Sequence, residues 1–304
     1  MAVLYLSNPT RGAVFAKYFT AELPDMAFHQ VTAPDPLAVT HMITWTLPDD
    51  LMQTYPNLRM ILSVGAGVDQ LDLSQLLAHI RVVRMLEPGL AEQMVEYVTM
   101  AVLGLHRNLP RYLDQQQCEV WQAHLNTPAS MRRVGVMGLG QLGLATVEAL
   151  RPFGFALSGF ARRPTEVTGV DCTTDKAEFL RDLDILVCLL PLADQTEGVL
   201  NANLMAQLKP GCGLVQVERG RYLDQDSLLD ALESGQISAA WLDVADPEPL
   251  PRDHALWAHP QTVVTPHIAC QTRPDDAAKH VIAAIKSDLA GTTIAGLIDR
   301  SRGY

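Results

Sequence analysis

The chain has few cysteines, few aromatic residues and no long apolar run. Its five cysteines are scattered without the paired spacing of metal-binding motifs, so we expect no metal site; they are Cys118, Cys172, Cys188, Cys212 and Cys270. Reduced thiols in a cytoplasm fit this usage best, and we expect Cys188, inside an apolar run, to fill the core. Every apolar run is too short to span a bilayer.

Basic residues are also scarce relative to acidic ones. The 304 residues include 23 Lys and Arg against 34 Asp and Glu, which gives a formal net charge of −11. This balance opposes nonspecific binding to nucleic acid or to anionic membranes. The start of the sequence, residues 1–6, lacks the basic region of a signal peptide and predicts a first strand. An anionic substrate would therefore need a local basic site.

The most informative segment that is present runs from Arg133 to Gly143, where an apolar strand meets Gly-x-Gly-x-x-Gly and then an amphipathic helix. Such a turn binds the pyrophosphate of a dinucleotide at the amino terminus of the helix. The expected cofactor-binding residues here are Gly138, Gly140, Gln141, Leu142 and Gly143. A nicotinamide or flavin cofactor is the first hypothesis, and a plain tight turn between strand and helix is the alternative.

The end of the next strand offers arginine where a site for NAD usually offers a carboxylate. Ala161-Arg162-Arg163 follows the run 155–160, about 20 residues after the glycines. A carboxylate would repel a 2′-phosphate, whereas two guanidinium groups can form charge-assisted hydrogen bonds to it. Arg162 and Arg163 therefore predict NADPH, with NADH used less well; a solvated pair of surface arginines is the alternative.

Strand-like runs alternate with helical stretches along the chain, which predicts an α/β fold of two domains. We expect a doubly wound, Rossmann-type parallel sheet in a dinucleotide-binding domain over 98–272. Residues 1–97 and 273–304 would form a smaller, discontinuous flavodoxin-like domain that binds the substrate and acts as a lid. A long helix over 91–117 and a closing helix over 274–289 are expected. Strands are expected at 3–6, 39–45, 60–64, 81–85, 155–160, 185–190, 213–217, 237–242 and 262–264.

Three strand ends in the second half carry residues suited to reducing a 2-oxo acid. That reaction needs a cation for the carboxylate and developing oxyanion, an acid for the carbonyl oxygen and a carboxylate that orients the acid. Arg219, His267 and Glu248 fit these three roles. Taken singly, each could be an ordinary surface residue or a local ion pair; their joint placement after a dinucleotide turn favours catalysis.

With these residues the chain resembles the D-2-hydroxyacid dehydrogenase family, whose pattern has Arg-Gly, Asp-Val with Glu-Pro, and Pro-His after successive strands. It is similar to the bacterial glyoxylate/hydroxypyruvate reductase A type through 65–69, 92–97, 272–274 and the ending 299–304. The resemblance implies that Arg219, Glu248 and His267 are catalytic and that Asp243 supports the site near the nicotinamide. It also implies cofactor contact at Pro191, backbone amides at Gly65, Ala66 and Gly67 that hold the substrate carboxylate, and a homodimer.

The substrate is expected to be a short 2-oxo acid, glyoxylate or hydroxypyruvate, because Trp45, Leu86 and Trp121 would narrow the pocket. One departure from the family is Glu218 beside Arg219, which would weaken the local positive field if it faced the site. A dehydrogenase for a larger 2-oxo acid and a nucleotide-sensing, corepressor-like protein on the same fold remain the alternatives.

Overall fold

The computed structural model describes residues 1–65, 67–68, 70–86, 89–190 and 196–299. The chain forms two compact units, each of which has its own sheet. Unit 1 comprises Met1–Leu90 and Thr272–Tyr304, and unit 2 comprises Ala91–Gln271. The division therefore falls near residue 90, inside the first turns of a helix, where the sequence suggested 97, and the return to unit 1 falls at 272.

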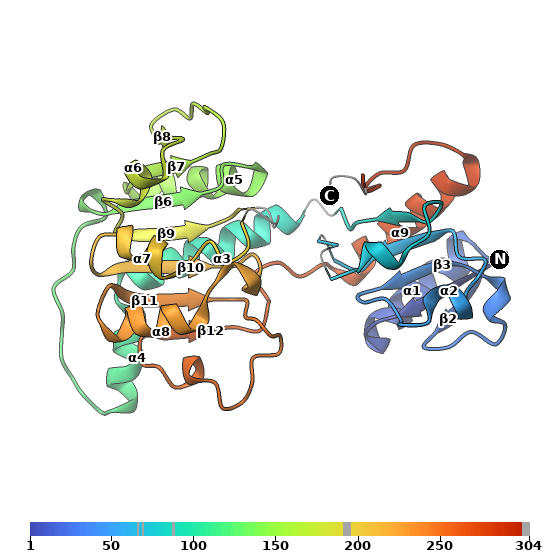
Figure 1. Cartoon of the computed structure of the whole chain (residues 1–304), viewed down its shortest axis with the longest axis horizontal. Coiled ribbons are helices and arrows are strands. Elements are labelled where there is room, and N and C mark those ends of the chain that lie inside the picture. The colour runs from blue at the N-terminus through green and yellow to red at the C-terminus, as the bar shows by residue number, and fades with distance from the viewer. Residues whose placement is uncertain (66, 69, 87–88, 191–195, 300–304) are drawn as a thin grey trace. The chain divides into compact units, whose positions relative to one another are not determined.

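Unit 2 contains a seven-stranded parallel sheet in the order β12-β11-β10-β9-β6-β7-β8 (Figure 1). The order reverses between β6 and β9, and ligands of such sheets bind beyond the carboxyl ends of the strands at this switch point. The expected Rossmann-type fold is confirmed. The strands are β6 (Arg133–Met137), β7 (Ala156–Phe160), β8 (Asp171–Thr173), β9 (Ile185–Cys188), β10 (Cys212–Gln216), β11 (Ile237–Leu242) and β12 (Thr262–Val264).

Helices cover both faces of this sheet, because its central strands are apolar on both sides. In β9, Leu186 belongs to the core on one face, while Val187 belongs to the core on the other. The first face is covered by α6 (Lys176–Leu180), α7 (Ala202–Gln207) and α8 (Gln225–Glu233), and the second by α3 (Gly89–His106) and α5 (Gln141–Leu150). In Figure 1, α7 and α8 lie in front of the sheet and α3 lies behind it.

The expected single helix over 91–117 is wrong, since the structure has two helices there. The first is α3, and the second is α4 (Leu109–Gln117). Asn108 between them adopts the left-handed conformation with φ of 57°, and Pro110 follows at the start of α4. Proline favours a helix start and disfavours a helix interior, so the two residues together end one helix and begin the next. The short edge strand β8 was also missed.

Unit 1 contains a five-stranded parallel sheet in the order β2-β1-β3-β4-β5, which is the flavodoxin-like order. Four strands were expected, and the edge strand β2 was not, because its alternating pattern is weakly apolar. The strands are β1 (Ala2–Leu6), β2 (Ala27–Gln30), β3 (Val39–Thr44), β4 (Met60–Ser63) and β5 (Arg81–Val83).

Two helices from opposite ends of the chain cover one face of the unit 1 sheet. They are α1 (Pro9–Glu22) and α9 (Pro274–Ala290), which pack against each other. Proline at N1 and two aspartates in the first turn favour the start of α9, and Gly291 ends it in a left-handed conformation. The other face is covered by α2 (Leu51–Thr54) and by segments between the strands.

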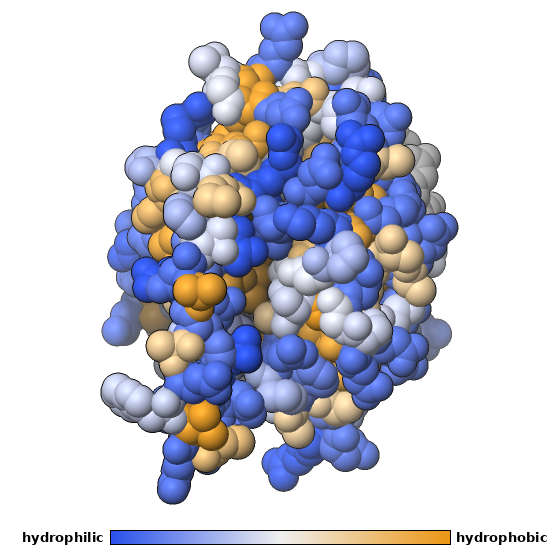
Figure 2. All heavy atoms as spheres, turned by 90° about the vertical axis from the view of Figure 1, so that its left-hand side faces the viewer, coloured by the Kyte–Doolittle hydropathy of each residue, from blue (hydrophilic) through white to orange (hydrophobic). Residues whose placement is uncertain are grey.

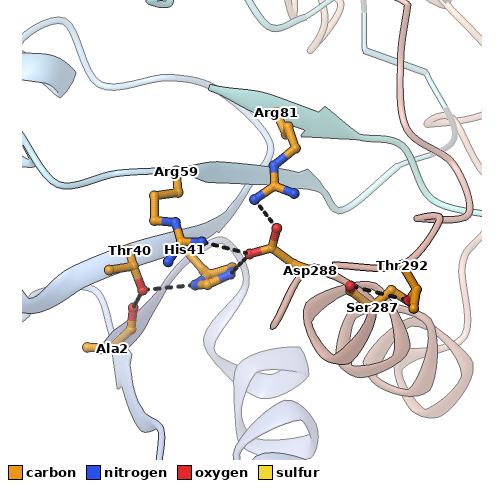
Figure 3. A network of polar contacts seen from close by, with 8 residues as sticks. All are labelled: Ala2, Thr40, His41, Arg59, Arg81, Ser287, Asp288 and Thr292. Carbon is orange, nitrogen blue, oxygen red and sulfur yellow. Dashed lines mark hydrogen bonds and ion pairs between the residues drawn. The ribbon is translucent and has the colours of Figure 1, made fainter. Parts of the chain in front are cut away.

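A buried polar network joins the last turn of α9 to the unit 1 sheet (Figure 3). Asp288 lies 3.3 Å from Nε2 of the fully buried His41, and it also pairs with Arg81 and, at 3.8 Å, with Arg59. Thr40 contacts the other ring nitrogen of His41. Burial lowers the pKa of His41 despite the Asp288 hydrogen bond, so the carboxylate is balanced mainly by the two guanidinium groups.

Replacing Asp288 with alanine is expected to lower the free energy of unfolding by about 2 kcal/mol, because the buried imidazole loses its partner while both arginines can turn to water. Denaturant unfolding followed by circular dichroism measures the effect. The matched control is Glu22→Ala, which removes the exposed Glu22–Lys286 pair between α1 and α9 and should cost less than about 1 kcal/mol. Equal losses in the two variants would contradict an anchoring role of Asp288.

In the described ranges, none of the helices has both the length and the apolar character that crossing a membrane requires. The surface in Figure 2 is mostly hydrophilic, with hydrophobic side chains in several separate places. None of the five cysteines, all of which the structure describes, forms a disulfide. Cys188 is fully buried in the sheet core, where burial raises the pKa of its thiol to about 12, so the prediction that it fills the core is confirmed.

Candidate functional site

The glycine turn of unit 2 has the shape that close approach of a ligand requires. Gly138 has φ of 110°, and a side chain there would collide with the Leu189 carbonyl. A side chain at Gly143 would collide with the Gly138 carbonyl, whereas a Cβ added at Gly140 would enter open space. Gly140 is also the N-cap of α5 and provides no side-chain cap. The amino end of α5, with Gln141 and Leu142 in its first turn, is therefore open to an anion.

The two expected phosphate-binding arginines lie beside this turn. The N–H of Gly138 donates to the carbonyl of Phe160, the last residue of β7, at 3.0 Å. Arg162 and Arg163 follow after Ala161 and are exposed. Within the described part of the chain, neither guanidinium pairs with a carboxylate, so both can bind an anion at the end of β7 without breaking an ion pair.

The segments after β10 and β11 contact each other closely. A Cβ at Gly220 would overlap the backbone of Ala245, so only glycine allows the contact. Gln216, fully buried at the end of β10, donates to the Arg219 carbonyl at 2.8 Å, and Arg219 Nη1 donates to the Glu218 carbonyl at 2.8 Å. These bonds fix the backbone that carries Arg219 next to the loop that carries Glu248.

His267 and Glu248 are directly hydrogen-bonded, as the sequence suggested. Nδ1 of His267 lies 2.9 Å from Glu248 Oε2, and the other carboxylate oxygen accepts the N–H of Ala245 at 3.1 Å. A carboxylate only accepts, so Nδ1 carries a hydrogen. Nε2 is therefore the ring nitrogen whose proton is gained and lost. The His267 side chain is 30% exposed and the Glu248 side chain 39%, so the pair is accessible to a small ligand.

The electrostatics of the pair favour the charged imidazolium. The hydrogen bond that His267 donates to Glu248 raises the pKa of His267, against the opposing effects of burial and of Arg219. Burial alone would raise the pKa of Glu248, but the hydrogen bond and charge of His267 lower it overall. Arg219 thus acts on both groups, which places its charge near them. Glu218 acts instead on Tyr222, whose pKa is raised first by burial and then by this neighbouring charge.

Asp243 is fully buried, and it holds the loop that carries His267. Its carboxylate accepts the Thr265 hydroxyl at 2.6 Å and the N–H groups of Ile268 and Ala269 at 2.9 and 2.7 Å. Its carbonyl accepts the N–H of His267 at 2.7 Å. All four hydrogen bonds fix the backbone around His267. The structural role of Asp243 is therefore to hold the shape of this loop.

The expected substrate-binding residues of unit 1 lie around the end of β4. The ring of Trp45 fills the space beside Gly65, where a Cβ would lie 2.6 Å from Cζ3 of the ring. The N–H of Gly65 already donates to Ser63 Oγ at 3.1 Å, so an anion would have to replace this bond. The Gly67 carbonyl accepts from Ser63 and Gln70.

The remaining residues expected at the substrate or cofactor site are Leu86, Ala66, Pro191 and Trp121. Leu86 is 39% exposed after β5. Ala66 and Pro191 lie outside the described residues. Trp121 is fully exposed on the segment after α4, where it lines an open groove with Tyr112 and Val120 of unit 2. In the described ranges, no group of three His, Cys, Asp or Glu side chains is arranged to hold a metal ion.

Sequence reasoning overlooked two hydroxyl groups next to Asp243. Thr265 lies in the segment Thr265-Pro266-His267 and donates to Asp243. Tyr97, in α3, contacts Thr265 although the two are far apart in the chain. The sequence gives one sign of this role: Tyr97 places a hydroxyl on an otherwise apolar face of the helix, three residues after Met94 and one before Val98.

Residues 99–269, more than half of the chain, match the family described as D-isomer specific 2-hydroxyacid dehydrogenase, NAD binding domain. The chain belongs to the D-isomer specific 2-hydroxyacid dehydrogenase family. It is 34% identical over 293 residues to a glyoxylate/hydroxypyruvate reductase A of Yersinia enterocolitica, covering 93% of this chain and 94% of the relative. The resemblance drawn from the strand-end motifs is thus confirmed.

Solved structures of D-2-hydroxyacid dehydrogenases match over the full length. A family member from Xanthobacter autotrophicus, solved with NADPH and MES, has a TM-score of 0.86 and 32% identity and covers 100% of this chain and 99% of its own. An NADPH-dependent glyoxylate/hydroxypyruvate reductase from Sinorhizobium meliloti, solved with NADP and sulfate, has a TM-score of 0.87 and 27% identity with the same coverage. This dehydrogenase therefore shares the architecture of dinucleotide-binding relatives.

Proposed function

We propose that the protein is an NADPH-dependent reductase of short 2-oxo acids, which converts glyoxylate to glycolate and hydroxypyruvate to glycerate. The observation that carries this proposal is the hydrogen-bonded His267–Glu248 pair, with the charge of Arg219 nearby, at the strand ends of a sheet that also bears the glycine turn. The similarity to reductases of this type, together with family membership, supports the choice of substrate class.

The residues around the glycine turn fit a phosphorylated dinucleotide. Gly138, Gly140 and Gly143 would let its pyrophosphate approach the amino end of α5, near Gln141 and Leu142. Arg162 and Arg163 would bind the 2′-phosphate of NADPH, since both guanidinium groups are exposed beside the turn. When bound, NADPH supplies the hydride that reduces the carbonyl carbon of the substrate.

The protein's own residues would bind the acid and deliver the proton. Arg219 would pair with the substrate carboxylate and stabilise negative charge that develops on the carbonyl oxygen. His267 would donate the proton on Nε2 to that oxygen, because Nδ1 is held by Glu248. Glu248 would stabilise the imidazolium before the transfer, and a proton from water would restore it afterwards. In unit 1, Trp45 and Leu86 would limit the size of the acid.

The direct test is NADPH oxidation by the purified protein, followed by absorbance, with glyoxylate, hydroxypyruvate, pyruvate and phenylpyruvate, each also assayed with NADH. We expect turnover with the first two acids and higher kcat/KM with NADPH than with NADH. A preference for phenylpyruvate would indicate a dehydrogenase for larger acids. Tight NADPH binding without turnover of any acid would indicate a nucleotide sensor and would overturn the proposal.

We also propose that the protein is a homodimer formed through unit 2. The segment after α4 exposes Val120, Trp121 and Leu125, whose exposed fractions are 48%, 104% and 97%. Large apolar side chains gathered on one segment mark an association surface. Sedimentation equilibrium of the purified protein should give twice the mass of one chain.

Replacing Arg162 and Arg163 together with glutamine should raise KM for NADPH by about 10²-fold and leave KM for NADH within about threefold, because only NADPH carries the 2′-phosphate. Steady-state kinetics with each cofactor at saturating glyoxylate provide the measurement. Arg181→Gln is a control, since it changes another exposed arginine of unit 2 that pairs with Asp182. Equal increases of KM for NADPH and for NADH would show that the arginine pair does not bind the 2′-phosphate.

Replacing Glu248 with glutamine should move the pH dependence of reduction to lower pH. The carboxylate raises the pKa of His267, so the wild-type imidazole stays protonated, and active as an acid, to a pH above its usual range. Without the charge, the pKa returns toward or below about 6.5. The alkaline fall in kcat should then occur at lower pH, and the rate at neutral pH should drop by about 10-fold or more. An unshifted pH profile would show that Glu248 does not control the pKa of His267.

A further inference from the structure

A chain of hydrogen bonds leads from α3 to the loop that carries His267, and all its members lie in unit 2. Trp241 Nε1 lies 3.0 Å from the Tyr97 hydroxyl, which contacts the Thr265 hydroxyl, which lies 2.6 Å from Asp243 Oδ1. Asp243 is fully buried, and Trp241 and Tyr97 are almost so, with 4% and 7% of their surfaces exposed. The proposed reaction uses neither Tyr97 nor Thr265.

The chemistry of the groups fixes the direction of every bond in this chain. The indole of Trp241 can only donate, and an ionised Asp243 carboxylate can only accept. Thr265 gives its single hydrogen to Asp243, so it must accept from Tyr97, and Tyr97 must accept from Trp241. Each hydroxyl therefore donates once and accepts once. A chain of hydrogen bonds that all point the same way is mutually strengthened by polarisation.

The Asp243 end of this chain of hydrogen bonds holds an unfavourable backbone conformation. His267 has φ of 53°, in the left-handed region that residues with a side chain seldom adopt. Such a conformation persists only when the surrounding structure imposes it. Here the imposing group is Asp243, whose carbonyl accepts the His267 N–H and whose carboxylate accepts the next two N–H groups. The turn directs the imidazole toward Glu248, 2.9 Å away.

At the other end of the hydrogen-bond chain, Trp241 packs tightly against α3. A Cβ at Gly104 would collide with the ring of Trp241. The ring fits against the helix because residue 104 has no side chain. Gly104 lies seven residues after Tyr97 and thus on the same face of α3. The helix therefore holds Trp241 by its ring and by its N–H at once, which makes α3 a rigid support for the chain.

We propose that Tyr97 is a positioning residue of the reductase, which acts through Thr265 and Asp243 to hold the left-handed turn that aims His267 at Glu248. This inference rests on the proposed function. Removing the Tyr97 hydroxyl leaves the buried Trp241 N–H without its acceptor and the Thr265 hydroxyl without its donor, so the Thr265–Asp243 bond is no longer polarised. The turn then spends less of its time in the conformation that joins His267 to Glu248.

The charged groups that act on His267 are Glu248, Arg219 and Asp243. Glu248 and Asp243 favour the protonated ring, and Arg219 disfavours it. A loosened turn weakens the Glu248 hydrogen bond first, so loss of the Tyr97 hydroxyl shifts the alkaline fall of the reaction to lower pH. It also lowers kcat by about 3- to 10-fold, because misplacement of a catalytic group lowers the rate more than it lowers binding. KM for the acid, which depends on Arg219, changes less than twofold.

The experiment compares Tyr97→Phe, Thr265→Val and Thr265→Ser in the full-length protein. Single-turnover NADPH oxidation with glyoxylate is measured across pH, together with KM and the melting temperature. Tyr97→Phe and Thr265→Val should both lower the rate and move the alkaline fall to lower pH. Thr265→Ser keeps the hydroxyl and should behave as wild type. The double variant Tyr97→Phe/Thr265→Val should be no slower than the slower single variant, because both changes break the same chain.

Two outcomes overturn the inference. In one, Tyr97→Phe lowers the melting temperature but leaves the pH profile and rate unchanged, which shows a purely structural hydroxyl. In the other, Thr265→Ser is as impaired as Thr265→Val, which shows that volume rather than hydrogen bonding matters. His267→Asn, assayed in parallel, separates these outcomes from failure of the proposed function: if that variant keeps full activity, the reaction itself is wrongly assigned.

Discussion

Replacing His267 with asparagine is expected to lower kcat for glyoxylate reduction by about 10³-fold. A positioned acid contributes about 10²- to 10⁴-fold to such a step, and an amide cannot donate the proton. Asparagine is the appropriate replacement, because residue 267 has φ of 53° and asparagine tolerates the left-handed conformation better than other residues with a side chain. It can also keep a hydrogen bond to Glu248, so the loop should remain folded. Stopped-flow measurement of NADPH oxidation gives the rate.

A folded, NADPH-binding His267→Asn protein distinguishes chemical from structural loss. Fluorescence titration should give an unchanged dissociation constant for NADPH, since the glycine turn and the arginines at the end of β7 are untouched. The residual rate should also lose the alkaline fall that titration of the imidazole causes in the wild type. A variant that retains more than about a tenth of the wild-type rate would exclude His267 as the principal acid.

Replacing Arg219 with glutamine is expected to lower kcat/KM for glyoxylate by about 10³-fold, mainly by raising KM. The guanidinium would supply both the counter-charge for the substrate carboxylate and stabilisation of the developing oxyanion, and the loss of one such group costs about 10²- to 10³-fold. Glutamine retains hydrogen bonding but not charge. Steady-state kinetics over a wide range of glyoxylate concentration measure the loss.

The same substitution also has a predicted effect on His267. The charge of Arg219 lowers the pKa of the imidazole, so its removal should let the pKa rise and move the alkaline fall in the residual rate to higher pH. Glu248→Gln should move it in the opposite direction. Arg221→Gln serves as a control, because Arg221 is two residues away but pairs with Glu197 at the surface. An Arg221→Gln protein as impaired as Arg219→Gln would mean that general disturbance of this loop causes the loss.

Much of the fold could be predicted because its strands are short apolar runs between turn residues, and ten such runs correspond to strands of the structure. The strands that were missed, β2 and β8, lie at sheet edges, where only one side is paired and the apolar pattern is weak. The break between α3 and α4 was missed because an apolar stripe continues past Asn108, and the helices are separated by the left-handed conformation of that residue and the proline that follows.

The sequence by itself determined the family, the glycine turn, the arginine pair and the pairing of His267 with Glu248. These features depend on residue types at fixed spacing along strand ends, and parallel strands bring their carboxyl ends to one edge of a sheet. Only the tertiary structure decided that Gly65 donates to Ser63, that Asp243 shapes the histidine loop, and that Tyr97 reaches Thr265. Those contacts join segments with no common local pattern, and they form because buried polar groups must find partners wherever the fold brings them together.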